Sequence, residues 1–362
     1  MRCAAGASLV APTQPVLAAT QMVSVPPGVP EYRDVALQIV VARTSNFPAS
    51  GARPWEALVL AVQRPGCPAL RVEVAGRGSL VLRQNDTVVL MAEVDSDRYG
   101  VEYTLTGQFC SPIPPIRAAY AASLGTEDQR GVRRARWAHH FVAALTSSTA
   151  GPLHTGRWVL SVEATHLRPA VRASTPAERW EELLLPDGPG YIDWFVDNGA
   201  WQILPLRPLA DPDTGRVKAF RKQAREGILP PVLLWWISGL DCYVLLDGHD
   251  RLVAALAEKV EPPVLCLSSV NTEQAARDTD AAVRRYARTA ELLEGHVTAG
   301  VPGATAARTA VNRRLAEHLT TIETAYGATR AWPLRGGTAR WNALATAHVP
   351  AWHAEMTRTE SP

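Results

Sequence analysis

An apolar stretch between residues 231 and 267 limits how this chain can fold more than any other feature of its sequence. Three polar breaks divide the stretch: Ser238-Gly239, the string DGHD at 247–250, and Glu261-Pro262-Pro263. Short runs rich in Val, Leu, Ile and Trp are typical of buried strands, whereas the run after DGHD has its apolar residues at helical spacing. We therefore expect strands over Pro231–Ile237, Asp241–Leu246 and Val264–Leu267, with a helix over Arg251–Lys259 before the last strand.

The string LLDGHDRLVAALAE places a strand end, a glycine and a helix start within a few residues. Gly248 tolerates backbone conformations that a Cβ disfavours, and it lets a ligand approach the main chain. The first turn of a helix has unpaired N–H groups and the positive end of the helix dipole, a combination that favours phosphate. Arg251 adds a guanidinium suited to phosphate oxygens, while Asp247 and His249 add groups for cation binding and proton transfer. In the alternative interpretation, Asp250 caps the helix and Arg251 lies on the surface.

Composition excludes several classes of protein. With 47% hydrophobic and 20% charged residues, the 362-residue chain can bury a core and is not disordered as a whole. A net charge of +2 gives no excess that points to nucleic acid or a membrane. Five scattered cysteines, none in a C-x-x-C pair, argue against a disulfide framework and a structural zinc site. Because scattered cysteines suit a reducing compartment, we expect a cytoplasmic protein. No apolar run reaches the roughly 18 residues of a transmembrane helix.

The sequence predicts an α+β protein of four parts. The first is a flexible leader rich in Ala, Pro and Thr, in which Pro12 and Pro15 interrupt the apolar run expected of a signal peptide. A strand-rich mixed domain, a central mixed-sheet domain and a helical region with a Trp-rich tail follow. The expected bounds are 1–29, 30–150, 151–271 and 272–362.

Hydrophobic periodicity also predicts elements outside the central stretch. Alternating runs separated by Gly, Pro and Asn turns indicate strands in the N-terminal part, followed by one helix. The C-terminal part has two amphipathic helices. The strands are expected at 57–62, 70–74, 79–82 and 87–94, and the helices at 129–145, 272–293 and 306–326.

The stretch from Gly227 to Leu267, GILPPVLLWWISGLDCYVLLDGHDRLVAALAEKVEPPVLCL, resembles the ParB/sulfiredoxin superfamily. Members of that superfamily share a Pro-Pro strand, a hairpin, a strand that ends in a small-residue turn, and a basic residue that opens a helix. The turn reads G-E-R-R in ParB partition proteins, where it binds CTP phosphates, and G-C-H-R in sulfiredoxins, where it binds ATP. In the free serine kinases it reads D-G-H-H-R and serves phosphoryl transfer to a small molecule. The string DGHDR at 247–251 is closest to this last form, with Asp250 in place of the second histidine.

The resemblance implies a site for ATP or another nucleoside phosphate with Mg²⁺. Asp247 is then the expected metal ligand or base, and His249 a second catalytic residue. Residues 248–251 are the expected phosphate-binding turn, made of Gly248, His249, Asp250 and Arg251. Glu163, at the end of a predicted strand, corresponds in position to the acidic base of the serine kinases.

A basic helix precedes the Pro-Pro strand. The segment RVKAFRKQAR, from Arg216 to Arg225, contains no acidic residue, and on a helix Arg221 and Lys222 share one face with the other cations. Arg221 and Lys222 are therefore candidate nucleotide contacts. The alternative is a helix face that only water covers.

Three functions remain open at this point. The first is a small-molecule kinase or nucleotide hydrolase, with a nucleotide and a small-molecule acceptor as partners. The second is a non-enzymatic module of ParB type in which a nucleotide switches DNA or protein binding, although the near-zero net charge does not favour nucleic acid. The third is a scaffold whose turn has lost its ligand.

Two further groups of residues are weaker candidates. His139-His140 has no partner at zinc-ligand spacing, so a packing role is expected. Asp193 and Asp197 are one helical turn apart if YIDWFVDNG is a helix, which makes a helix surface the default and a metal site the alternative.

Overall fold

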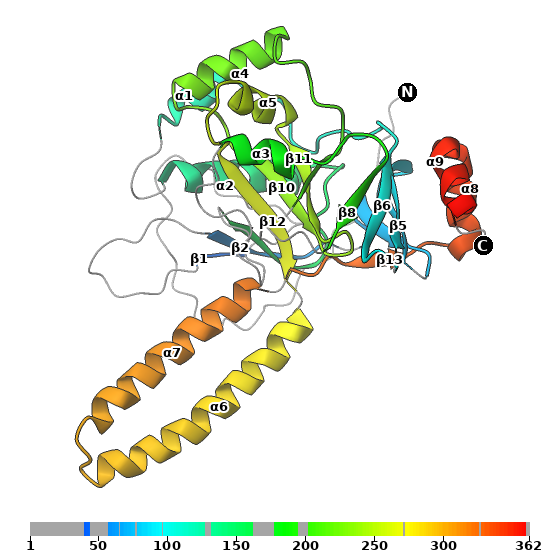
Figure 1. Ribbon diagram of the computed structural model, residues 1–362. Coiled ribbons are helices and arrows are strands. Elements are labelled where there is room, and N and C mark those ends of the chain that lie inside the picture. Colours follow the sequence, from blue (N-terminus) through cyan, green and yellow to red (C-terminus); the bar gives the residue numbers. More distant parts are fainter. Residues whose placement is uncertain are drawn as a thin grey trace, which may run out of the picture. The chain divides into compact units, whose positions relative to one another are not determined.

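A computed structural model describes residues 40–43, 57–64, 66–76, 78–95, 97–126, 132–161, 177–194, 202–270, 272–325 and 327–359. By its internal contacts the chain divides into two units, Met1–Glu31 and Tyr32–Pro362, and all described residues lie in the second. The expected leader at 1–29 lies outside the described residues. The described part is a mixed α+β structure with two mixed sheets, as Figure 1 shows.

The first sheet has seven strands in the order β1-β2-β7-β12-β10-β11-β9. β10 pairs antiparallel with β11 and parallel with β12, while β2 pairs antiparallel with β7 along its full length. This sheet therefore continues across the domain boundary that we expected between residues 150 and 151. Its strands are β1 (Val40–Arg43), β2 (Ala57–Val62), β7 (Gly156–Ser161), β9 (Ile203–Pro205), β10 (Val232–Ile237), β11 (Cys242–Asp247) and β12 (Val264–Val270).

The second sheet has six strands in the order β13-β3-β4-β5-β6-β8. Its last strand corrects the sequence-based expectation for Asp193, which ends β8 and pairs with Gly100 instead of lying on a helix. Asp197 lies outside the described residues. The strands are β3 (Leu70–Val74), β4 (Ser79–Gln84), β5 (Thr87–Asp95), β6 (Gly100–Leu105), β8 (Gly190–Asp193) and β13 (Ala331–Pro333).

The Trp-rich tail packs on the second sheet. β13 pairs parallel with β3, and the indole of Trp341 is buried and donates a hydrogen bond to the Leu80 carbonyl at 3.2 Å. Trp352 packs beside Trp341 with ring centroids 6.1 Å apart. The tail thus covers the strand-rich region and does not form a domain of its own.

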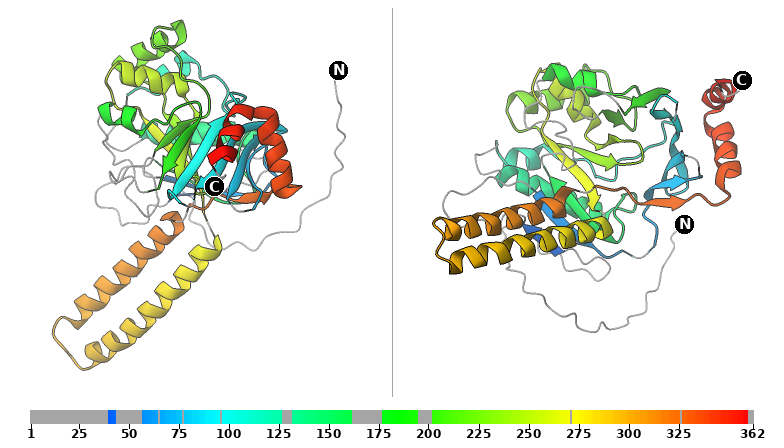
Figure 2. Two further views of the ribbon diagram at one scale, coloured as in Figure 1. Left: turned by 45° about the vertical axis from the view of Figure 1, so that its right-hand side comes forward. Right: turned by 60° about the horizontal axis from the view of Figure 1, so that its bottom comes forward.

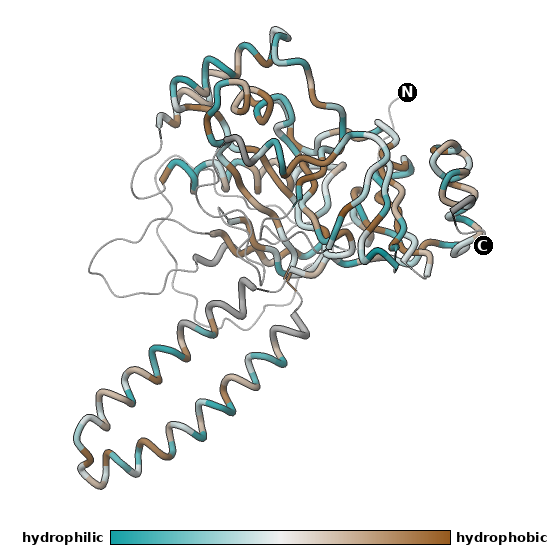
Figure 3. The backbone as a smooth tube through the Cα atoms, viewed as in Figure 1, coloured by the Kyte–Doolittle hydropathy of each residue, from teal (hydrophilic) through white to brown (hydrophobic). Residues whose placement is uncertain are grey.

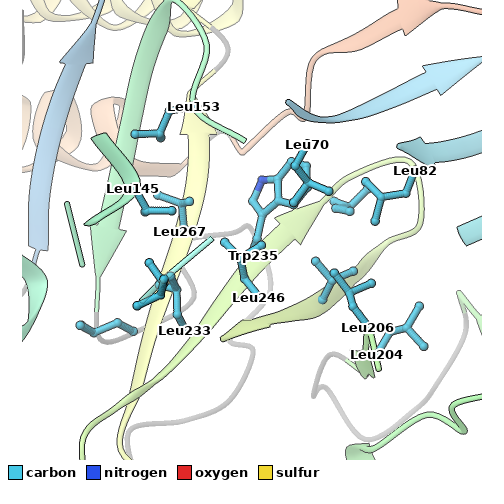
Figure 4. Close-up of a cluster of buried hydrophobic side chains, with 14 of the residues drawn as sticks. Leu70, Leu82, Leu145, Leu153, Leu204, Leu206, Leu233, Trp235, Leu246 and Leu267 are labelled. Atoms are coloured by element: carbon cyan, nitrogen blue, oxygen red, sulfur yellow. The ribbon is translucent and has the colours of Figure 1, made fainter. Parts of the chain in front are cut away.

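One hydrophobic core joins the two sheets. Its residues include Leu70 and Leu82 from the second sheet and Leu233, Trp235 and Leu246 from the first, all 2% exposed or less. In Figure 4, Trp235 lies between Leu70 and Leu246. Because the same buried side chains serve both sheets, we expect the two sheets to unfold together.

Several helices pack close to the first sheet. Those nearest the first sheet include α2, which contributes Trp137 and Phe141 to the shared core, and α4 and α5, which pack on each other. The helices are α1 (Ala118–Ser123), α2 (Val132–Ser147), α3 (Ala177–Leu183), α4 (Gly215–Arg225), α5 (His249–Ala257), α6 (Thr272–Thr298), α7 (Ala304–Ala325), α8 (Gly337–His348) and α9 (Pro350–Thr359).

The helices α6 and α7 form an antiparallel hairpin that extends away from the sheets, as Figure 1 and the left view of Figure 2 show. The hairpin is inserted where the chain pairs with itself, because Val270 and Gly327 form a β-bridge. In Figure 3, hydrophilic and hydrophobic residues alternate along the α6–α7 hairpin. β10 in the first sheet is different, because all six of its residues are buried. Within the described part of the chain, none of the helices combines the length and the apolar character needed to cross a bilayer.

Candidate functional site

The turn between β11 and α5 has the strand end and the glycine that the sequence predicts, and its helix begins and ends two residues earlier than the expected Arg251–Lys259. β11 ends at Asp247, Gly248 has a φ of +100°, and α5 begins at His249. A Cβ at Gly248 would lie 2.8 Å from Nη2 of Arg251 and 3.0 Å from Cγ1 of Val232. Both the backbone angle and the lack of space require glycine here.

The first turn of α5 has no side-chain cap. In contrast, the neighbouring helix α4 is capped by Thr214, whose hydroxyl accepts a hydrogen bond from the Val217 N–H at 3.4 Å. The first N–H groups of a helix have no partner within it and mark the positive end of its dipole. The α5 N-terminus therefore keeps donors that an anion can use.

Two side chains hold the Asp247 carboxylate, one from α5 and one from the segment after β6. Its Oδ2 accepts a hydrogen bond from Nη2 of Arg251 at 2.6 Å, and its Oδ1 accepts one from the Ser111 hydroxyl at 2.7 Å. The same Nη2 donates to the Pro231 carbonyl at 2.9 Å. Arg251 is 4% exposed, whereas the Asp247 side chain keeps 14% exposure. The guanidinium thus orients Asp247 and does not lie open to a phosphate, in contrast to the direct contact that we expected.

Asp250 is also paired. Its carboxylate lies 3.2 Å from Nη2 of Arg207 and 2.9 Å from Nε of Arg216. Asp250 is 6% exposed, while the side chains of its two partners are 38% and 63% exposed. Together with the pair of Asp247 and Arg251, three guanidiniums face two carboxylates, so these five groups carry one excess positive charge. The carboxylate of Asp250 therefore does not make this turn negative.

His249 is buried at the start of α5. It is 1% exposed, its Nε2 has no hydrogen-bond partner among the described residues, and its ring centroid lies 6.2 Å from that of Phe109. Burial above all, together with the charges of Arg207 and Arg251, lowers the pKa of His249 to about 3. At neutral pH the ring is uncharged, so it can donate or accept a hydrogen bond but does not carry a proton as imidazolium.

This lowered pKa predicts a pH dependence of stability. An unfolded chain takes up a proton on His249 near the usual pKa of 6.5, which the folded chain does only near 3. The contribution of His249 is therefore complete above pH 6.5 and is lost as the pH falls, by about 1.4 kcal/mol per pH unit. Urea unfolding at pH 7, 6 and 5 should show a shallower loss in His249→Gln than in the wild type, and His296→Gln, on exposed α6, should keep the wild-type slope. Equal slopes in all three proteins would refute the assignment.

The structure does not bring the other predicted contacts to this turn. Arg221 donates to Glu258 at 2.6 Å, and Glu258 caps the opposite end of α5. Lys222 is 72% exposed and lies 3.8 Å from Glu226. The basic face of α4 is thus largely neutralised by nearby carboxylates. Glu163 lies outside the described residues.

Two residues near the turn, Ser111 and Arg207, were missed in the sequence, whereas for His140 we expected only a packing role. Ser111 follows β6, Arg207 follows β9, and His140 of α2 lies close enough to Arg251 and Asp247 for their charges to act on its pKa, which burial lowers. Ser111 is 136 residues away from its partner in sequence. No local pattern marks such contacts, because they depend on how the two sheets pack.

The hydrogen-bond donors at this turn fit a phosphate group, and one carboxylate, that of Asp247, is of the kind that binds Mg²⁺. Within the described ranges no three His, Cys, Asp or Glu side chains gather as a metal-binding group. Mg²⁺ accompanying a nucleotide commonly takes only one or two protein carboxylates and completes its shell with phosphate and water. Asp247 is the group near the turn with that character, since its side chain is partly exposed.

Comparisons of the chain with protein-family models, with curated proteins and with solved structures found no match.

Proposed function

We propose that the β11–α5 turn binds the phosphate groups of a nucleoside phosphate together with Mg²⁺, and that the protein transfers or hydrolyses phosphate there. The observation that carries the proposal is the α5 N-terminus, which starts at Gly248 without a side-chain cap and beside the buried, unpartnered Nε2 of His249. A buried polar atom without a partner costs about 1–3 kcal/mol, which a ligand that pairs with it would recover. The resemblance of DGHDR to the turn of the free serine kinases points to the same chemistry.

Phosphate recognition is assigned to the main chain and to two exposed arginines. The N–H groups of His249 and Asp250 would donate to phosphate oxygens. Arg207 and Arg216 lie beside them, and their exposed guanidiniums keep further donors after pairing with Asp250. Neutral His249 would add one hydrogen bond. The excess positive charge of the turn favours an anionic ligand over a neutral one.

Asp247 would hold the cation. Arg251 and Ser111 each take one lone pair of its carboxylate oxygens, which leaves others for Mg²⁺. Mg²⁺ supplies charge neutralisation on the phosphate oxygens in reactions of this type. Since the buried guanidinium fixes the carboxylate, little reorganisation is needed when a ligand binds.

A panel of ATP, CTP and GTP with Mg²⁺ tests this proposal by thermal shift and by phosphate release. At least one nucleotide should raise the melting temperature, and a nucleotide that binds without phosphate release would favour the non-enzymatic switch. If no nucleotide changes the melting temperature, with or without Mg²⁺, the proposal fails.

Replacing Arg216 should weaken this binding. We expect Arg216→Gln to lower nucleotide affinity about tenfold, because one charge-assisted hydrogen bond to phosphate is lost. Lys222→Gln is the matched control, since it removes a cation from the same helix at a position paired with Glu226. Calorimetric titration should separate the two variants. Equal affinities in Arg216→Gln and Lys222→Gln would show that Arg216 does not contact the ligand.

A further inference from the structure

Ser111 lies 136 residues before Asp247 in the sequence, and it contacts Asp247 directly. It belongs to the segment that joins β6 to α1, far from the strands that carry DGHDR. Its hydroxyl lies 2.7 Å from Oδ1 of Asp247 and also 3.3 Å from the Ile113 carbonyl, and it accepts a hydrogen bond from the Ile113 N–H at 3.1 Å. Its hydroxyl is therefore placed by its own segment.

The segment that presents Ser111 is fixed independently of this contact. The side-chain amide of Gln84 on β4 forms two hydrogen bonds with the backbone of Cys110. It donates to the carbonyl at 2.7 Å and accepts from the N–H at 2.9 Å. Thr106, earlier in the same segment, donates to the Val88 carbonyl at 2.5 Å. Loss of the Ser111 hydroxyl should therefore leave the segment in place and change mainly the carboxylate.

We propose that Ser111 is a positioning residue for Asp247, which it holds in the orientation that binds a divalent cation. This inference rests on the proposed function. Arg251 donates to Oδ2 and Ser111 donates to Oδ1, so each carboxylate oxygen has a partner that favours one orientation of the carboxylate. Partners of this kind, which orient a metal ligand without touching the metal, commonly change metal affinity 10–100-fold.

The arrangement also gives the strand-rich N-terminal region a part in the site. β4 holds the segment through Gln84, β5 holds it through the Val88 carbonyl that accepts from Thr106, and the segment in turn contacts Asp247. The central strand–turn–helix is therefore not the whole site, and a fragment limited to residues 151–271 would lack this contact.

The test measures nucleotide binding by the full chain as a function of Mg²⁺ concentration. We expect Ser111→Ala to raise the Mg²⁺ concentration at half-maximal effect about tenfold, with nucleotide affinity in the absence of Mg²⁺ unchanged. Ser111→Thr keeps the hydroxyl and should restore most of the effect. Thr106→Ala is the control, because it removes an anchor of the same segment without contacting Asp247.

The outcomes separate this inference from the function on which it rests. If the wild type binds nucleotide and its Mg²⁺ response is the same in Ser111→Ala, the role of Ser111 is refuted and the proposed function stands. If Ser111→Ala and Thr106→Ala weaken binding equally at every Mg²⁺ concentration, Ser111 acts only as a structural anchor. If the wild type binds no nucleotide, both proposals fall.

Discussion

Arg251→Met is expected to lower the free energy of unfolding by about 3 kcal/mol, because removing one member of a buried ion pair leaves the other charge buried without compensation. The Arg251 side chain is 5% exposed and the Asp247 side chain is 14% exposed, and Nη2 of Arg251 lies 2.6 Å from Oδ2 of Asp247. Methionine fills a similar volume, so lost packing adds little. Urea unfolding at pH 7 measures the change.

A double-mutant cycle shows whether the loss comes from this pair. Asp247→Asn keeps an oxygen for Ser111 but removes the charge, and we expect the double variant Asp247→Asn, Arg251→Met to lose clearly less than the sum of the single variants. Arg225→Met removes a guanidinium that is 56% exposed, and it leaves Glu258 paired with Arg221, so it should change stability little. Losses that simply add would mean that Asp247 and Arg251 do not depend on each other.

Gly248→Ala is the second large change, and we expect it to cost about 3 kcal/mol. A side chain at a positive φ costs about 1–2 kcal/mol, and overpacking costs a further 1–3 kcal/mol. The added Cβ would lie 2.8 Å from Nη2 of Arg251 and so would also displace the group that orients Asp247. Thermal and urea unfolding should both report the loss.

Gly66→Ala separates the two causes. Gly66 has a φ of +86°, and a Cβ there meets no atom within 4 Å, so this variant suffers only the backbone strain. The difference between the two alanine variants therefore measures the crowding at the turn. Equal losses would indicate that the close approach of Arg251 and Val232 has no energetic consequence.

Apolar and alternating runs made several strands of both sheets predictable from sequence. β2 and β3 have the predicted bounds, and β10 and β11 each differ from prediction by one residue at one or both ends. β9 and β13, with three residues each, are too short to show periodicity. β8 was misjudged because Asp193 and Asp197 suggest helical spacing, whereas pairing with β6 determines the conformation.

The candidate site was predictable in its backbone and not in its side-chain partners. Gly248 and the helix start at DGHD follow from local chemistry, and local chemistry also placed Arg251 at the turn. The Arg251 side chain turns inward because the Pro231 carbonyl and the Asp247 carboxylate accept hydrogen bonds from its guanidinium. The partners of Asp250 and the contact with Ser111 come from other elements, so only the packed structure reveals them.

The most direct test of the central claim follows the backbone amide of His249. Selective ¹⁵N-histidine labelling gives signals from only nine residues, and His249→Gln identifies the one at the turn. Titration with a nucleotide and Mg²⁺ should shift this signal strongly, because a phosphate oxygen would accept a hydrogen bond from that N–H, while the signal of His296 should stay in place. A nucleotide that binds while the His249 amide signal remains unchanged would contradict the assignment of phosphate to the α5 N-terminus.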